Sequence, residues 1–116
     1  MKKTKKNFIE NYSTNPELAK LTLQQGGVDW TDIVERPNDY YDVSSGSVPG
    51  MIYYTDTVVF AEKNHLKILQ ALEEFEAEIG EQLNKPRTED ETAYYNWMAW
   101  FAWEHTMGEV INYLES

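Results

Sequence analysis

Two histidines and the carboxylates beside them are the residues of this chain that could best support metal or acid–base chemistry. Glu62 and His65 form a Glu-x-x-His element, and di-iron sites in helical bundles use two such elements. Glu104 and His105 are adjacent, but a second Glu-x-x-His element does not occur. A metal-binding protein or small metal-dependent enzyme that uses these four residues is therefore an alternative interpretation. We expect no metal and no other cofactor.

Other catalytic signatures are missing from the sequence. It contains no phosphate-binding loop, no Gly-x-Gly-x-x-Gly and no Gly-x-Ser-x-Gly pattern. It also contains no cysteine, which excludes a disulfide framework, a thiolate zinc site and a cysteine nucleophile. We therefore expect a protein that is not an enzyme.

The charge of the chain is strongly asymmetric. The net charge is −10, yet four of the ten basic residues lie within the first six positions. Residues 7–116 thus hold six basic and 20 acidic groups, a charge of −14. Such a body repels phosphate backbones, so we expect no direct nucleic-acid binding. A partner with a basic surface is favoured, and the alternative is that the acidity only maintains solubility.

Carboxylates concentrate on one expected helix, and these are the candidate partner-binding residues: Glu73, Glu74, Glu76, Glu78 and Glu81. Carboxylates on a rigid helix can mimic the phosphate spacing of DNA and occupy the basic groove of a nucleic-acid enzyme. A solvated helix face is the simpler alternative. Tyr40 and Tyr41, in the irregular connection 38–50, are further candidate contact residues.

Capping signals divide the chain into about four helices. Asn15 and Pro16 predict the start of a helix that Gly26-Gly27 ends. A short apolar stripe over 30–36 stops at Pro37. Apolar residues at helical spacing then continue over 55–83, with a bend and a second cap at Asn64.

The last helix is expected to begin with a capping box. Thr88 is the expected cap, Glu91 reaches back to it, and the helix runs to about Leu114. We expect the 55–83 and 89–115 helices to form an antiparallel central pair. The sequence thus predicts a mainly α fold, with residues 1–7 as a basic flexible tail and 8–116 as a single small helical domain. Residues 51–54 are also compatible with one short strand.

Tryptophans dominate the last helix, where Asn96–His105 reads NWMAWFAWEH. Trp97 and Trp100 fall on the expected apolar face and are predicted to be core residues, whereas Trp103 lies on its flank. Glu104 interrupts that face. Because a buried carboxylate must be paired, we expect Glu104 to be a buried polar anchor with a partner on another segment.

The remaining sequence features concern location. No stretch approaches the roughly 20 apolar residues of a membrane span. The basic start is followed directly by polar residues, so we expect no signal peptide, no membrane association and a cytoplasmic protein.

Several motifs together resemble a group of small acidic accessory proteins that phages and conjugative elements encode. They are Asn11-Tyr-Ser-Thr-Asn-Pro16, Gly26-Gly27 with Trp30, Gly50-Met-Ile-Tyr-Tyr-Thr-Asp-Thr57, and the tryptophan-rich segment 99–104. The resemblance covers most of 8–110 and supplies no catalytic residues. It implies an accessory gene of a mobile element that works inside a bacterial cell. Small acidic proteins from that context include inhibitors of restriction and CRISPR nucleases, so by analogy it favours a non-enzymatic protein that binds and inhibits a host nucleic-acid-handling enzyme. A homodimeric structural or assembly protein is a further alternative, and the sequence leaves the oligomeric state open.

Overall fold

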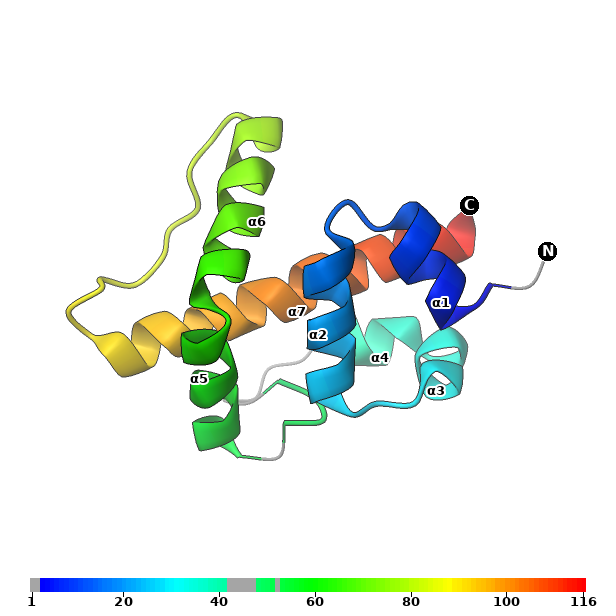
Figure 1. Cartoon of the computed structure of the whole chain (residues 1–116), viewed down its shortest axis with the longest axis horizontal. Coiled ribbons are helices and arrows are strands. Elements are labelled where there is room, and N and C mark those ends of the chain that lie inside the picture. The colour runs from blue at the N-terminus through cyan, green and yellow to red at the C-terminus, as the bar shows by residue number, and fades with distance from the viewer. Residues whose placement is uncertain (1–2, 42–47, 52) are drawn as a thin grey trace.

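The computed structural model describes residues 3–41, 48–51 and 53–116. As the sequence predicts, it is mainly α-helical and forms one small domain. The described residues contain no β-strand, and residue 52 of the expected strand at 51–54 lies outside them. The elements, shown in Figure 1, are α1 (Lys5–Asn7), η1, a π-helical turn (Phe8–Tyr12), α2 (Pro16–Gly26), α3 (Trp30–Glu35), α4 (Pro37–Tyr41), α5 (Tyr54–Lys63), α6 (His65–Ile79) and α7 (Glu91–Glu115).

The long helix α7 is the centre of the fold. It contacts α2, α4, α5, α6 and η1, and Figure 1 shows α5 and α6 crossing it at a steep angle. The predicted antiparallel pair is therefore wrong. Buried residues lie around most of the circumference of α7. A single helix packed alongside it would leave apolar surface in water, so several short elements must cover it.

The predicted bend at Asn64 is confirmed, because α5 and α6 are separate helices that meet there. The end of this segment differs from the prediction. Helix α6 stops at Ile79, not residue 83, since Gly80 adopts a left-handed conformation with φ of 77°. Glycine takes this conformation without steric cost.

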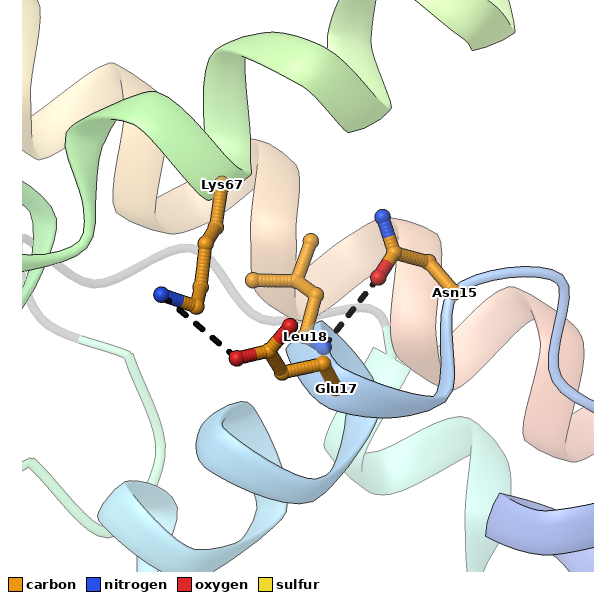
Figure 2. Close-up of polar contacts among 4 residues, drawn as sticks. All are labelled: Asn15, Glu17, Leu18 and Lys67. Atoms are coloured by element: carbon orange, nitrogen blue, oxygen red, sulfur yellow. Dashed lines mark hydrogen bonds and ion pairs between the residues drawn. The ribbon is translucent and has the colours of Figure 1, made fainter.

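Helix α2 begins and ends as its capping residues predict. The Asn15 side chain accepts a hydrogen bond from Leu18 N at 3.2 Å, and Gly27 follows the helix with φ of 65°. Figure 2 shows this cap beside an ion pair that joins the start of α2 to α6, between Lys67 Nζ and Glu17 Oε1 at 3.5 Å. The Glu17 side chain is 73% exposed and that of Lys67 43%, so water screens the pair and it contributes at most about 1 kcal/mol.

The predicted capping box at Thr88 is wrong. Helix α7 starts at Glu91, and the Asp90 side chain caps it by accepting a hydrogen bond from Ala93 N at 3.3 Å. Thr88 and Asp90 are both good cap residues, and the turn closed by Asp90 N and Arg87 O favours the later start.

The tryptophans of α7 are buried in a different order from the prediction. Trp103 is 0% exposed, whereas Trp97 and Trp100 are only half-buried against the core. The covered face of α7 also includes Met98, Ala99, Ala102, Met107 and Val110. Small alanines among these residues let the neighbouring helices approach closely, and the large Trp103 ring fills the space between them.

Trp103 is also the point at which several segments meet. Its Nε1 donates a hydrogen bond of 2.6 Å to Tyr40 O in α4. Gly26, at the end of α2, lies so close that a Cβ there would be 2.6 Å from Trp103 Cζ3. Gly50 approaches the Gly26 carbonyl closely enough to exclude any side chain. The ring therefore joins α2 and α4 to α7, and the close approach of Gly50 to Gly26 places the 48–51 segment against the end of α2.

Residues 1–7 were expected to form a flexible tail, but residues 3–7 pack against the end of α7. Lys3 Nζ donates hydrogen bonds to Ser116 O and Oγ and lies 4.7 Å from the Tyr113 ring centroid. Asn7 Nδ2 donates to Tyr113 Oη at 2.7 Å. The basic segment thus packs on the end of α7, a contact across more than 100 residues of chain. Residues 1–2 lie outside the described residues.

The connection expected at 38–50 is partly helical. Helix α3 ends at Glu35, just before Pro37, as predicted. Pro37 then begins α4, which was not predicted, since its fixed φ suits the first position of a helix. Val48 and Met51 are buried. Residues 42–47 lie outside the described residues. No helix among the described residues combines the length and the apolar content that a membrane crossing requires.

Replacement of Trp103 by alanine should lower the free energy of unfolding by about 3–5 kcal/mol, because it empties a fully buried aromatic site. Trp100→Ala, at a half-buried position on the same helix, is the matched control and should cost less. Trp103→Phe should lie between them, since it retains a ring but leaves Tyr40 O without its donor. Urea unfolding followed by circular dichroism measures all three. An equal or larger cost for Trp100→Ala would contradict the assigned register of α7.

Candidate acidic interaction surface

The carboxylates predicted to form one face of a helix have different environments in the structure. Glu73, Glu74, Glu78 and Glu81 are exposed. Glu76 is half-buried, and its Oε2 accepts a hydrogen bond of 2.7 Å from Leu83 N. Glu76 therefore stabilises the chain after α6 and is a poor candidate for partner binding.

The exposed carboxylates also lie on two sides of α6. Glu74 and Glu78 are one turn apart and line a hollow of about 130 Å³ between α6, α7 and the start of α2. Glu73 lies about 100° around the helix from Glu74, and Glu81 follows the helix end at Ile79. The single acidic face of the sequence prediction is thus replaced by a concave side and an outer side.

A larger groove of about 410 Å³ adjoins that hollow and shares Thr14, Phe75, Glu78 and His105 with it. It is open to solvent, and its walls come from η1, α4, α6 and α7. The lining residues are Tyr12, Thr14, Tyr41, Phe75, Glu78, Glu104, His105, Gly108, Glu109 and Asn112. Neither hollow has a lysine or arginine among its lining residues. We call the two together the acidic groove, with Glu74, Glu78, Glu104 and Glu109 as its carboxylates.

Glu104 does not have the buried position that we expected. It is exposed and lines the acidic groove. The reason is the register of α7: because Trp103 points into the core, the next residue, about 100° further around the helix, points outward. Glu104 does have an interaction within the structure, but its position is not that of a core anchor.

Glu109 has the anchoring role that the sequence suggested for Glu104. Its Oε1 accepts a hydrogen bond from Ser13 Oγ at 3.0 Å. Its Oε2 accepts two more from Thr14, from the backbone N at 3.1 Å and from Oγ1 at 2.7 Å. The carboxylate thus holds the chain just before α2 against α7. Sequence reasoning missed this pair because no local pattern links residues 95 positions apart.

The two candidate tyrosines have separate roles. Tyr40 is half-buried against the core, and its carbonyl accepts the Trp103 hydrogen bond. Tyr41 is 41% exposed and lines the acidic groove. Of the two, Tyr41 is therefore placed to contact a partner.

The four residues of the metal alternative do not form one cluster. His65 Nε2 lies 2.8 Å from Tyr94 Oη, and Glu62 and His65 line one surface hollow together with Tyr95. Glu104 and His105 lie in the acidic groove, where the His105 ring stacks on Phe101 and meets the edge of Phe75. Within the described residues, no group of three or more His, Cys, Asp or Glu could hold a metal ion.

The His65–Tyr94 contact has the features of a structural hydrogen bond. Tyr94 is nearly buried. Burial, with a smaller effect from the neighbouring Tyr95, raises the pKa of the Tyr94 phenol above its usual value of 10.0. The phenol is therefore neutral at physiological pH and does not act as a base there.

The chain belongs to the family described as Domain of unknown function (DUF7222), whose model matches residues 5–116. No curated protein matches the chain, and no solved structure matches it.

Glu109→Ala should lower the free energy of unfolding by about 1–3 kcal/mol, because the Ser13 and Thr14 donors lose their acceptor. Glu109→Gln should cost less, since the amide oxygen still accepts. Glu73→Ala, at an exposed position on α6, should change stability by no more than about 0.5 kcal/mol. Thermal and urea unfolding measure these differences. Equal stability of the Glu109→Ala and Glu73→Ala variants would rule out the anchoring role.

Proposed function

We propose that this protein is a non-enzymatic binding protein whose acidic groove, with the exposed carboxylates of α6, docks on a basic surface of a partner protein. The observation that carries the proposal is the convergence of Glu74 and Glu78 from α6 with Glu104 from α7 around a concavity that no lysine or arginine lines. Lysine or arginine side chains of a partner would pair with Glu74 and Glu78, and Tyr12 and Tyr41 line the same groove, where their rings could contact a cation.

The position of these carboxylates supports a role beyond solubility. Glu74 and Glu78 occupy the C-terminal half of α6, where the helix dipole disfavours negative charge. They also repel each other across one turn. A hydrogen bond of 3.3 Å from Gln70 Nε2 to Glu74 Oε1 offsets part of this cost. The arrangement therefore costs some folding free energy, which binding of a cationic partner would recover.

The accessibility of α6 supports the same role. Figure 1 shows the C-terminal half of α6 projecting away from α7. Glu73 and Glu81 add exposed charge beyond the groove. Such a surface attracts a basic protein through long-range steering, and its effect weakens as salt screens the charges.

In its most specific form, the proposal is that the protein mimics DNA. The exposed carboxylates would occupy the groove in which a nucleic-acid-handling host enzyme binds its substrate, and so inhibit that enzyme. The resemblance to accessory proteins of phages and mobile elements supports a role against a host defence enzyme inside the bacterial cytoplasm. Competition with nucleic acid distinguishes this form from binding at any other basic surface.

A second candidate function is a homodimeric structural or assembly protein. Its support is a set of exposed apolar side chains on α5, α6 and the residue before α5. Tyr53 is 68% exposed, Val59 57% and Leu66 79%. In this case association would depend on apolar contact and would persist at high salt.

Reversal of three carboxylates tests the proposal. The variant Glu74→Lys, Glu78→Lys, Glu81→Lys should lose the partners that the wild type captures from host lysate. Partner recovery by the wild type should also fall between low and physiological salt, because exposed ion pairs are screened. Mass spectrometry of the captured proteins measures both effects, and added duplex DNA should displace the partner in the DNA-mimic case.

A matched control distinguishes an effect of where the charges are reversed from an effect of the change in net charge. Glu35→Lys, Glu62→Lys, Glu89→Lys changes the net charge equally at exposed positions away from the acidic groove, and it should retain the partners. Circular dichroism verifies that both variants are folded. Recovery of the same partners by both variants at both salt concentrations would contradict the proposal and would favour the apolar surface.

A further inference from the structure

A second hollow carries the opposite charge. It has a volume of about 600 Å³, lies between α1, η1 and α2, and is lined by Lys5, Lys6, Ile9, Glu10, Lys20 and Gln24. Lys5 and Lys6 are neighbours in sequence, but the fold brings Lys20 from α2 beside them. We call this hollow the lysine cavity.

The three lysines are available to a ligand. All of them are exposed, and none has an ion-pair partner among the described residues. Lys3 of the same basic segment, in contrast, is held by Ser116 and the Tyr113 ring. The structure thus uses one lysine of this segment for packing and leaves the others around an open cavity.

The composition of the cavity favours phosphate over carboxylate. Its cations are lysines, which bind phosphate as point charges. A phosphate group carries up to about twice the charge of a carboxylate and offers three acceptor oxygens, so it gains more from several lysines around one hollow. Three lysines against Glu10 leave a net positive charge. Ile9, half-buried at the wall, offers apolar contact to the remainder of a ligand, and the volume is in the range of small-molecule sites, about 300–1,000 Å³.

The surrounding charge restricts the size of the ligand. The molecule measures 47 × 33 × 22 Å, and its sequence beyond the first six residues carries 20 acidic groups. The Debye length at physiological salt is about 8 Å. A duplex or a membrane surface that crossed the molecule would soon leave the lysines and meet these carboxylates, whereas a compact anion would not.

We propose that the lysine cavity binds a compact phosphate-bearing molecule. This site goes beyond the proposed function, because it lies on α1, η1 and α2 and shares no residue with the acidic groove. The protein would then present two surfaces of opposite charge, one for a basic protein and one for a small anion.

Titration of the ¹⁵N-labelled full chain with tripolyphosphate at low salt tests this proposal. Amide shifts should change first at Ile9, Glu10 and Gln24. The variant Lys5→Gln, Lys6→Gln, Lys20→Gln should bind at least about tenfold more weakly, as expected for the loss of three exposed charge contacts. Glu10→Gln should bind more tightly, since it removes the one carboxylate that lines the cavity.

Three controls make the result decisive. Lys63→Gln, Lys85→Gln, Arg87→Gln removes the same charge at exposed positions elsewhere and should bind like the wild type. A short DNA duplex and tetraglutamate should both bind more weakly than tripolyphosphate. The proposal is overturned if no shift occurs, if both triple variants bind equally, or if the duplex or the peptide binds as tightly as tripolyphosphate.

Discussion

The burial of Trp103 is the constraint on which the rest of this structure depends. Its ring is fully enclosed, and its indole N–H satisfies the Tyr40 carbonyl. Because Gly26 lies against the same ring, one side chain fixes how α2 and α4 sit on α7. The acidic groove follows from this arrangement. Glu104, next to Trp103, must then point outward, and Tyr41, next to Tyr40, is brought to the groove wall.

The elements were more predictable than the contacts between them. Asn15, Gly27 and Asn64 mark helix ends through local backbone chemistry, so their positions could be read from the sequence. The rotation of α7 about its own axis could not be read from the sequence, because apolar residues surround most of that helix. A core face centred on Trp103 is almost as apolar as one centred on Trp100. The groove was only partly predictable. Glu78 and Tyr41 were candidates, whereas Glu109 acts through Ser13 and Thr14, and no local rule pairs residues so far apart.

The fold separates two groups of side chains with opposite charge. Four carboxylates lie around the groove between α6 and α7, and three exposed lysines lie around a cavity at α1 and α2. The packing of Lys3 and Asn7 on Tyr113 and Ser116 holds the basic segment against the end of α7. These contacts place Lys5 and Lys6 at α1, around a cavity that shares no residue with the acidic groove.

The central claim is that the acidic groove is the surface that contacts a basic partner. Carbodiimide labelling of carboxylates, read by mass spectrometry in the free protein and in its complex with a captured partner, tests it at single residues. The account predicts that the partner protects Glu74 and Glu78 from labelling, while Glu35, Glu62 and Glu89 react as in the free protein. Unchanged labelling of Glu74 and Glu78 in the complex would contradict it.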